Sequence, residues 1–380
     1  MSWEKVSLDK ICTMLSGNAW TASKFKDEGQ IPIIRIQNLG NNENEKFIWW
    51  DESYDKKYIV NKGDILLSLS GSIKVDVWNG IDALLNQRIV KLIPNKNIHH
   101  KWFYWQITNI ILDIERMGKW ALVNNVAITD LKDLEIPLPP IATQKRIAEI
   151  LDAADALRRK DQELLKKYDE LAQAIFIDMF GNPVKNEKGC DVKSLDKITT
   201  KLGDGIHGTP NYSMDGKYYF INGNNLENGT IVVNESTKKV DENEFLKHKK
   251  ELNENTMLVS INGTIGKVAF YKGENIILGK SACYFNIDKT QVSPIYLYSL
   301  IKSNYFVHYA GENATGSTIK NVSLKTMREF PVPLPPLSKQ MIYDEQITLI
   351  WESIKIVNRN DEKLLFNSLI NKAFKGELVA

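Results

Sequence analysis

Short apolar runs bounded by Gly, Asn and Lys recur along the first part of the chain. They cover residues 31–36, 63–70 and 87–93, and runs of this length and composition predict β-strands. Residues 102–117 carry apolar side chains at helical spacing instead, and the aromatic residues among them are expected in a core. The pattern predicts an α+β domain with short strands and polar loops.

The same order of elements returns in the second half of the chain. Residues 217–222, 256–262 and 281–287 are the strand-like runs, and a helical pattern follows near 295–310. The two halves therefore predict two similar mixed domains.

Direct sequence matches support a duplication. Four pairs occur in the same order in both halves: SLDKI at 7–11 and 194–198, GDILLSLSGSI at 63–73 with NTMLVSINGTI at 255–265, NVAI at 125–128 with NVSL at 321–324, and IPLPP at 136–140 with VPLPP at 332–336. Chance matches would not keep this order, so the chain is a repeat of one unit.

Each P-L-P-P is followed by the pattern of a long helix. The prolines hold the incoming chain extended and precede the first turn, while Gly181 and Gly376 mark the helix ends. Apolar residues recur in steps of three and four, with a gap at Asp161 and at Asp361, which predicts a heptad seam. The seam positions are Ile147, Ile150, Ala154, Leu157, Leu164, Tyr168, Leu171 and Ile175, and then Ile347, Ile350, Ile354, Val357 and Leu364.

These patterns predict an α+β architecture with a pseudo-two-fold repeat. The expected parts are a domain over 1–140, a helix over 141–181, a domain over 182–336 and a helix over 337–380. The second helix buries its seam by returning antiparallel beside the first as a coiled coil, which brings the chain ends near each other. RRKDQELL at 158–165 also matches NRNDEKLL at 358–365, at an offset of 200 residues against 196 for the two P-L-P-P motifs. These four additional residues predict one extra helical turn near the start of the second helix.

Composition adds few constraints. The chain has 380 residues, 43% of them hydrophobic, which is enough for two or three domains with ordinary cores. It contains no run of about 18 apolar residues, so no membrane span is expected. The three cysteines are far apart in the sequence, and the net charge is +2. This cysteine usage is typical of reduced thiols in the cytoplasm, and any nucleic-acid surface must come from local clustering.

Two similar domains that are related by a pseudo-two-fold axis and joined by a pair of helices suit a ligand that has two-fold symmetry axes itself. Duplex DNA is such a ligand, because half-sites recur on one face at each helical turn. The loops carry side chains that pair with base edges and phosphates. In the first domain these candidates are Arg35, Gln37, Asn38, Ser70, Ser72, Lys74, Gln87 and Arg88. In the second they are His207, Thr209, Asn211, Tyr212, Asn222, Asn224, Asn225, Asn262, Thr264, Lys267 and Lys280.

A solvated turn is the alternative for each of these loops taken alone. Their recurrence at matching positions in both copies favours a binding face. The copies share their scaffold but not their loop residues, so the expected target is asymmetric, with a different half-sequence for each domain.

Three features together resemble a known family: the duplicated layout, the P-L-P-P-x-x-x-Q entry to each helix, and GDGIHGTPNY at 203–212 with the strand–Gly turns at 68–74 and 260–267. The chain resembles the specificity subunits of Type I restriction–modification systems over essentially its whole length. One departure is MLSGNAWTASKF at 14–25, where the second copy has LGDGIHGTPNY, so these loops are not expected to match position by position.

The resemblance implies two target-recognition domains on double-stranded DNA and a docking site for two methyltransferase subunits. Those subunits would bind S-adenosylmethionine and methylate adenine in a bipartite site, so no cofactor is expected in this chain. Whether restriction subunits that use ATP and Mg²⁺ join is left open. The expected docking surface is the charged outer face of the helices, with a merely solvated face as the alternative. Its residues are Lys145, Arg146, Arg158, Arg159, Lys166 and Lys167.

The motifs argue against catalysis by this chain. It has no N/D-P-P-Y/F tetrapeptide to hold a flipped base, no phosphate-binding G-x-x-x-x-G-K-[ST] loop, and no paired metal-ligand spacing. Two alternatives to a non-catalytic subunit stay open. One is an autonomous DNA-binding regulator or antirestriction protein of the same fold, and the other is a hydrolase that uses Asp204 and His207.

Overall fold

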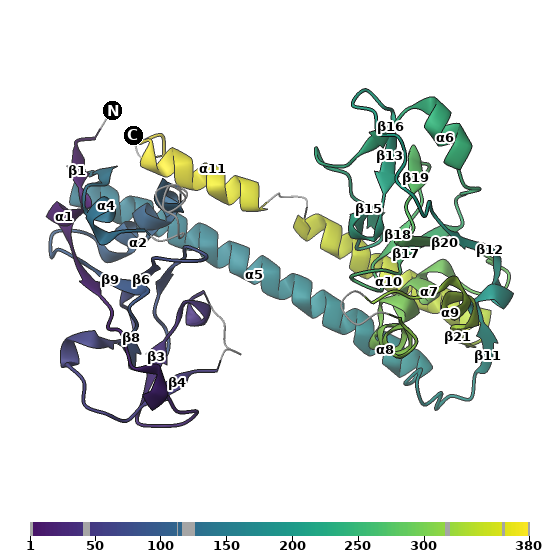
Figure 1. Cartoon of the computed structure of the whole chain (residues 1–380), viewed down its shortest axis with the longest axis horizontal. Coiled ribbons are helices and arrows are strands. Elements are labelled where there is room, and N and C mark those ends of the chain that lie inside the picture. Colours follow the sequence, from purple (N-terminus) through teal and green to yellow (C-terminus); the bar gives the residue numbers. More distant parts are fainter. Residues whose placement is uncertain are drawn as a thin grey trace. The chain divides into compact units, whose positions relative to one another are not determined.

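The computed structural model describes residues 3–40, 46–111, 113–115, 126–315, 320–358 and 362–378. These residues form two units (Figure 1). Unit 1 comprises Met1–Gln162 with Asn358–Ala380, and unit 2 comprises Glu163–Val357. Among the described helices, none is both long and apolar enough to cross a membrane.

Unit 1 is built from short strands and helices followed by a long helix. Its strands are β1 (Lys5–Ser7), β2 (Cys12–Ser16), β3 (Ile31–Ile34), β4 (Ile48–Trp50), β5 (Ile59–Val60), β6 (Ile65–Ser68), β7 (Val75–Val77), β8 (Ala83–Leu85), β9 (Ile89–Pro94) and β10 (Glu135–Pro137). Its helices are α1 (Leu8–Ile11), α2 (His100–Asn109), α4 (Ile128–Lys132), the first part of α5 (Ile141–Phe180) and α11 (Glu362–Phe374), with 3-10 turns at Ala22–Lys24, Ile36–Asn38 and Lys56–Tyr58.

Unit 2 repeats this plan. Its strands are β11 (Asp191–Ser194), β12 (Thr199–Asp204), β13 (Tyr218–Ile221), β14 (Leu226–Glu227), β15 (Thr230–Ile231), β16 (Lys239–Val240), β17 (Thr256–Ser260), β18 (Val268–Phe270), β19 (Ile276–Leu278), β20 (Ala282–Ile287) and β21 (Pro331–Leu334). Its helices are the rest of α5, α6 (Glu242–His248), α7 (Pro294–Lys302), α8 (Asn304–Glu312), α9 (Leu324–Glu329) and α10 (Leu337–Asn358), with 3-10 turns at Leu195–Ile198 and Gly223–Asn225.

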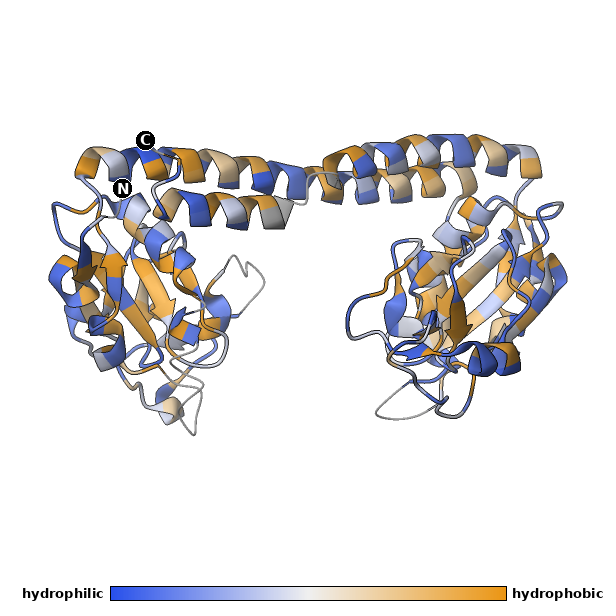
Figure 2. Cartoon of the chain, turned by 90° about the horizontal axis from the view of Figure 1, so that it is seen from above, coloured by the Kyte–Doolittle hydropathy of each residue, from blue (hydrophilic) through white to orange (hydrophobic). Residues whose placement is uncertain are grey.

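The sheet orders show the repeat directly. The four-stranded sheet β2-β9-β6-β7 of unit 1 corresponds to β12-β20-β17-β18 of unit 2. A second sheet in each unit contains one parallel pair, β3 with β8 and β13 with β19. Hydrophobic side chains dominate the central strands of both units, and β6 and β17 are buried at every position (Figure 2). The mixed α/β class and the repeat expected from the sequence are confirmed.

One expected helix is divided. The pattern over 295–310 predicts a continuous helix, whereas α7 ends at Lys302 and α8 begins at Asn304. Ser303 between them has an extended backbone, and its hydroxyl accepts a hydrogen bond from Tyr305 N as the N-cap of α8. Serine favours this capping position over a helix interior.

Each P-L-P-P enters its helix as expected, with the preceding residues in a two-stranded edge pairing. β1 pairs with β10 and β11 with β21, both antiparallel. Proline is tolerated in such edge strands because one side of the strand needs no ladder hydrogen bonds. Gly181 and Gly376 follow the helix ends with positive φ values of 75° and 78°, which confirms their role as helix terminators.

A buried glutamine explains the rest of the motif. In unit 1, Gln144 Nε2 donates to Pro139 O (2.9 Å), and Gln144 Oε1 accepts from His99 N (2.8 Å). In unit 2, Gln340 Nε2 donates to Pro335 O (2.8 Å), and Gln340 Oε1 accepts from Ser293 N (2.8 Å). His99 and Ser293 are the N-caps of α2 and α7. We call this arrangement the glutamine clamp: it ties the P-L-P-P segment to the start of α2 in unit 1 and to the start of α7 in unit 2.

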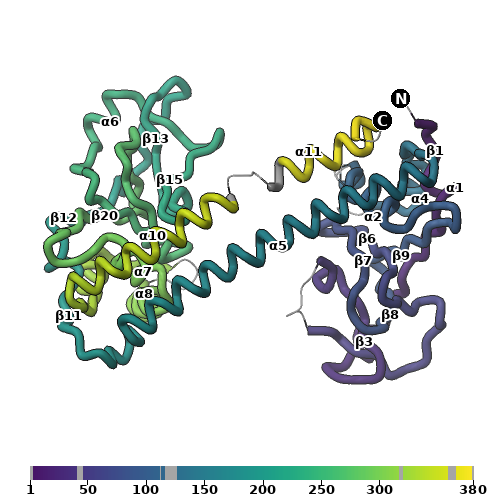
Figure 3. The backbone as a smooth tube through the Cα atoms, turned by 180° about the vertical axis from the view of Figure 1, so that it is seen from behind, coloured from purple at the N-terminus to yellow at the C-terminus, as the bar shows by residue number. Residues whose placement is uncertain are grey.

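The helices pack antiparallel within each unit (Figure 3). In unit 1, Ile147 and Leu151 near the start of α5 share a core with Ile370 and Phe374 near the end of α11. In unit 2, the rings of Phe176 and Phe180 near the end of α5 lie 5.7 and 5.2 Å from Tyr343 near the start of α10. Trp3 and Leu378, at the two described ends of the chain, both pack against the unit 1 core, as expected.

The expected seam is wrong at three positions of α5. Ile147 is buried, and Tyr168 and Ile175 are partly buried, but Leu157, Leu164 and Leu171 are 62%, 37% and 47% exposed. The buried apolar residues of α5 instead follow the face that each end turns toward its own unit, and these are Ile147, Ala148, Leu151, Phe176 and Phe180.

The C-terminal helical segment is described in two parts. It was expected as one helix, but it is described as α10 and α11, and residues 359–361, which include the match at Asp361, lie outside the described residues. Ile347 and Ile350 are buried as expected, and the side chain of Leu364 is outside the described part. Residues 141–180 precede Gly181 and residues 337–375 precede Gly376. The second segment is therefore one residue shorter in total, and the extra turn predicted near its start stays a prediction because Asp361 lies outside the described residues.

Replacing Gln340 by Ala should destabilise unit 2. The change leaves Ser293 N–H and Pro335 C=O buried without their partner, at a cost of about 2 kcal/mol or more in the free energy of unfolding. Urea unfolding of the full chain measures this, with Gln173→Ala on the exposed surface of α5 as the matched control. Equal unfolding midpoints for the two variants would show that the clamp does not contribute.

Candidate nucleic-acid interface

The two loops with unlike sequences at 14–25 and 203–212 share one backbone geometry. Asn18 N donates to Leu85 O (3.0 Å) at the end of β8, and Ile206 N donates to Leu278 O (2.7 Å) at the end of β19. Gln87 N then donates to Asn18 O, and Lys280 N donates to Ile206 O, both at 2.9 Å. The expectation that these loops do not match position by position is therefore wrong for this part of them.

A glycine makes that geometry feasible. A Cβ on Gly17 would lie 2.0 Å from Asn86 O, and a Cβ on Gly205 would lie 1.9 Å from Leu278 O. No side chain fits at either position, because these distances are far below van der Waals contact. The matching hydrogen bonds of Asn18 and Ile206 make Gly17 and Gly205 equivalent positions. By the same alignment, the further equivalent pairs are Ser16 and Asp204, Ala19 and His207, and Gln87 and Lys280.

In unit 2, the loop at 203–212 lines a cleft of about 320 Å³. Three candidates from three separate loops line it, namely His207, Asn262 and Lys280. Asp204 at the end of β12 also lines it, together with Asn321 and Ser323. We call this cavity the unit 2 cleft. Convergence of the candidates from distant parts of the sequence makes it the candidate reading site.

Asp204 and His207 form a hydrogen-bonded pair in the cleft. His207 Nε2 donates to Asp204 Oδ2 over 2.7 Å, since a carboxylate can only accept. The His207 side chain is 74% exposed, whereas that of Asp204 is 15% exposed. The carboxylate, which is the more buried of the two groups, therefore fixes the orientation of the ring, and the imidazole faces solvent.

Asn321 and Ser323 were missed from the sequence, although the repeated NVAI/NVSL segment is the signal that could have found them. Val322 N donates to Ile261 O as Val126 N donates to Leu69 O, both at 2.8 Å. This segment therefore lies beside the strand–Gly turn in both units. The Ser323 hydroxyl accepts from Thr326 N (3.0 Å) as the N-cap of α9, which is a structural role.

The strand–Gly turns are built alike. Ser68 Oγ donates to Ser72 O (2.8 Å) and accepts from Lys74 N (2.7 Å), and Ser260 Oγ donates to Thr264 O (2.5 Å) and accepts from Lys267 N (2.9 Å). A serine side chain thus closes each turn. Ser72 and Thr264 are exposed at the turns, while Ser70, Lys74 and Lys267 are half-buried. Lys74 Nζ points back to Leu39 O (3.5 Å).

Several asparagines predicted to read DNA instead hold their own loops. Asn38 is buried and its Oδ1 accepts from Arg35 N (2.8 Å), as Asn225 Oδ1 accepts from Asn222 N (3.0 Å). Asn222 Oδ1 accepts from Ser281 Oγ (3.0 Å). Arg35 is also turned inward, with Nη2 donating to Lys46 O (2.9 Å). These four side chains thus make contacts within their own loops, while Arg35 Nε and Asn38 Nδ2 are buried without a hydrogen-bond partner. Their role as DNA contacts stays a prediction.

The remaining candidates lie at the surface. Asn211 contacts Glu244 through its backbone and side-chain amides (3.2 and 3.4 Å), and the Tyr212 ring lies 5.9 Å from Phe220. The other candidates are exposed, and they are Gln37, Gln87, Arg88, Thr209 and Asn224.

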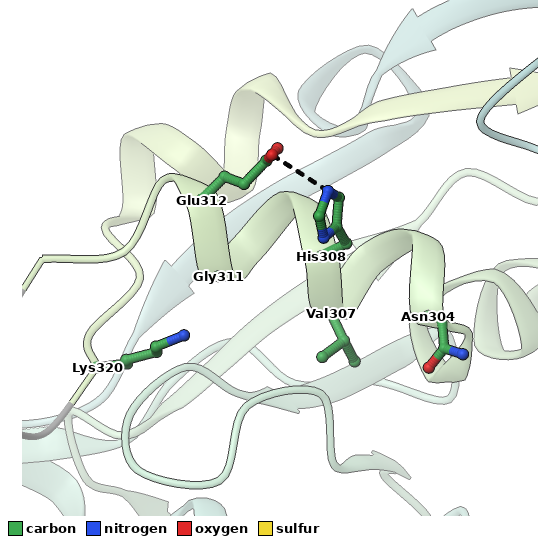
Figure 4. Close-up of a pocket in the computed structure, with 6 residues that line it drawn as sticks. All are labelled: Asn304, Val307, His308, Gly311, Glu312 and Lys320. Atoms are coloured by element: carbon green, nitrogen blue, oxygen red, sulfur yellow. Dashed lines mark ion pairs between the residues drawn. The ribbon is translucent and has the colours of Figure 1, made fainter.

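A second hollow of about 450 Å³ runs along α8 (Figure 4). His308 Nε2 and Glu312 Oε1 form an ion pair across one helical turn (3.1 Å), and Asn304, Val307, Gly311 and Lys320 complete the lining. None of these residues is a sequence-based candidate. Lys320 directly precedes Asn321, so this hollow adjoins the segment that lines the unit 2 cleft.

Other features of the described residues do not indicate a reactive centre. No group of three or more His, Cys, Asp or Glu side chains within them could hold a metal ion. Burial raises the pKa of Cys12 to about 12 and raises the pKa of Cys283 further above its ordinary value. Both thiols are therefore poor nucleophiles near neutral pH.

Comparison with known proteins gives a consistent picture. The family model for the Type I restriction modification DNA specificity domain matches residues 1–167 and again 188–364. The chain belongs to this family. Its two matched segments fall on the two copies of the repeat, and DNA recognition is the function that the family membership gives the chain.

Similar proteins carry the same description. The EcoBI specificity subunit of Escherichia coli is 24% identical over 100% of this chain and 87% of that protein. The putative MjaX specificity subunit of Methanocaldococcus jannaschii is 24% identical over 95% of this chain and 90% of that protein. The S subunit from M. genitalium has the same fold, with a TM-score of 0.56 and 16% identity over 98% and 96% of the two chains. These relatives do not favour the alternative of an autonomous regulator.

Replacing Gly205 by Ala should disrupt the unit 2 cleft. The added methyl group would meet Leu278 O, so the loop must move away from the end of β19, at a cost of about 2 kcal/mol or more in the free energy of unfolding. Gly208→Ala is the matched control, because a Cβ there meets nothing within 4 Å. Unfolding measurements on the full chain compare the two. A Gly205→Ala variant as stable as Gly208→Ala would contradict the assigned geometry.

Proposed function

We propose that each unit reads one half of an asymmetric bipartite site in double-stranded DNA, and that this chain carries no catalytic activity of its own. The observation behind the proposal is a shared scaffold with different side chains at equivalent loop positions. Asp204, His207 and Lys280 in unit 2 stand where Ser16, Ala19 and Gln87 stand in unit 1. Two domains that share a fold but carry different loop side chains suit the recognition of two different half-sequences.

The hydrogen-bonded pair of Asp204 and His207 in the unit 2 cleft has a binding role in this proposal. Hydrolysis would need a nucleophile activated by the base, but the nearby Ser323 hydroxyl caps α9 and contacts Thr326 Oγ1 (2.9 Å). The chemistry of modification therefore belongs to methyltransferase partners. Those partners would bind S-adenosylmethionine, and restriction subunits, if they join, would bind ATP and Mg²⁺.

The long helices offer a docking surface for such partners. On α5, Leu157, Leu164 and Leu171 are exposed at intervals of seven residues. On α10, Ile342, Leu349 and Ile356 repeat the interval and are 52%, 64% and 65% exposed. We call these two rows of exposed leucine and isoleucine side chains together the leucine stripes. Seven-residue spacing keeps side chains on one helix face, which is the pattern that packs against another helix.

The charged residues predicted for docking are largely engaged within the chain. Asp155, which is buried, pairs with Arg158 (2.6 Å) and Arg159 (2.7 Å), and the guanidinium of Arg158 lies 5.4 Å from the Phe366 ring centroid. Lys166 pairs with Glu170 and Lys167 with Glu163, while Arg146 lies 3.5 Å from Glu149. Lys145 is exposed. The leucine stripes therefore provide a better docking surface than the charged face.

Replacing Leu164 and Leu171 together by Glu should release the methyltransferase partner. Burial of each leucine contributes about 1.5–3 kcal/mol, so affinity should fall about 100-fold or more. Co-purification of the co-expressed subunits measures this, with the exposed Gln173→Glu as control. Retention of the partner by the double variant at the level of the control would exclude this surface.

The helices between the two units are proposed to set the number of unread base pairs. Four residues inserted after Gln162 in α5 and four after Val357 in α10 add about 6 Å to each. This length corresponds to about two base pairs, at 3.4 Å each. Mapping of modified bases in cells that carry the chain and a methyltransferase subunit should give a bipartite site for the natural chain. The variant should modify the same half-sites with a longer spacer.

The two parts of this experiment separate the claims. A single undivided target for the natural chain would overturn the two-reader proposal. An unchanged spacer in the lengthened variant would overturn only the role of the helices as a ruler.

A further inference from the structure

We infer that equivalent positions in the two units each read one base pair, with Lys280 selecting guanine in one half-site and Gln87 selecting adenine in the other. This inference rests on the proposed function and names base identities within it. It follows from the equivalence of the two loops and from the chemistry of the unit 2 cleft.

Lys280 projects from a turn whose backbone is fixed on both sides. Its own N–H donates to Ile206 O (2.9 Å), and Ala282 N donates to Gly279 O (3.0 Å) across the turn. Ser281 Oγ donates to Asn222 Oδ1 and accepts from Gly223 N (2.9 Å). The Lys280 side chain itself is exposed and lines the cleft. A donor held on a rigid base in this way can select one geometry of acceptor.

The charges of the cleft favour a base edge over a phosphate. The formal positive charge of Lys280 is matched by the negative charge of Asp204 in the same cleft. A phosphate gains little from such a balanced site and is repelled by the carboxylate, whereas a base edge is neutral. Guanine presents two acceptors, O6 and N7, in the major groove, and lysine is one of the side chains that pair with them.

The neighbouring ring adds a second donor or acceptor. His207 Nε2 is bonded to Asp204, so Nδ1 is the ring nitrogen available to a ligand, and the side chain is 74% exposed. Asp204 is therefore a positioning residue in this scheme, and Lys280 with His207 would touch the base pair.

Unit 1 presents different chemistry at the same positions. Gln87 N donates to Asn18 O as Lys280 N donates to Ile206 O, and both residues stand two positions after a parallel strand, β8 or β19. The Gln87 side chain is exposed. A glutamine amide donates to N7 and accepts from N6 of adenine, which makes adenine its natural partner in the major groove. Ser16 and Ala19 replace Asp204 and His207, so unit 1 carries no formal charge at these three positions.

The test is a map of modified sites in cells that carry the full chain with a methyltransferase subunit. The natural chain should modify a bipartite site with an invariant G·C pair in one half and an invariant A·T pair in the other. Lys280→Gln should lower discrimination for that G·C pair about tenfold or more, in favour of A·T, and leave the other half-site unchanged. Gln87→Lys should make the reciprocal change in the other half-site.

Two further variants keep the result interpretable. Lys280→Arg should retain the G·C preference, because arginine pairs with the same acceptors. Lys289→Gln removes an exposed lysine beyond the opposite end of β20, and it should change neither half-site.

Each other outcome has a clear meaning. If Lys280→Gln lowers modification at all sites equally and changes no base preference, Lys280 contacts a phosphate and the inference is overturned. If Lys280→Gln changes the same half-site as Gln87→Lys, the assignment of one reader to each unit is overturned. If the natural chain directs no bipartite modification at all, the proposed function fails instead.

Discussion

The glutamine clamp is the constraint on which the rest of the fold depends. Each unit must turn an extended proline segment into a long helix at a fixed angle to its domain, and the P-L-P-P carbonyls and the first N–H groups of α2 or α7 need partners there. One glutamine, 2% exposed in unit 1 and 0% exposed in unit 2, supplies both a donor and an acceptor. Because both groups are buried, a residue that supplies only one of them leaves an unpaired polar atom. This explains why the same four-residue spacing from proline to glutamine occurs twice.

The clamp also fixes which surfaces remain for function. With each helix start locked to its domain, aromatic packing closes the same side of each unit, through Trp102 with Phe374 (6.3 Å) in unit 1 and through Tyr296 with Phe176 (5.5 Å) in unit 2. In the proposed function, the loops at the ends of the parallel strands contact DNA, and the outer helix faces contact partners. DNA recognition and partner docking are thus proposed for different parts of the scaffold, although α5 contributes to the structure of both units.

Much of this could be predicted from the sequence, because apolar spacing and repeated segments report burial and topology. The strand-like runs became β3, β6 and β9 and their counterparts β13, β17 and β20. The failures have a common cause, which is that a one-dimensional pattern does not show where a polar group or an apolar side chain points. Asn38 and Asn225 match a base-reading composition but satisfy their own loops, whereas Leu164 matches a buried seam but faces solvent. The equivalence of Gly17 and Gly205 could not be predicted either, because the hydrogen bonds that define it join residues far apart in the sequence.

The place of α11 in unit 1 has a consequence for synthesis of the chain. A ribosome makes the N-terminus first, and domains ordinarily fold in that order. Unit 1, however, keeps Trp102 and Trp105 open until Phe366 and Phe374 have been made, since those rings complete its core. Unit 2 has all its own segments by Val357. The part of the molecule that is translated first is therefore completed last, and its aromatic surface at Trp102 and Trp105 stays uncovered until α11 has been made.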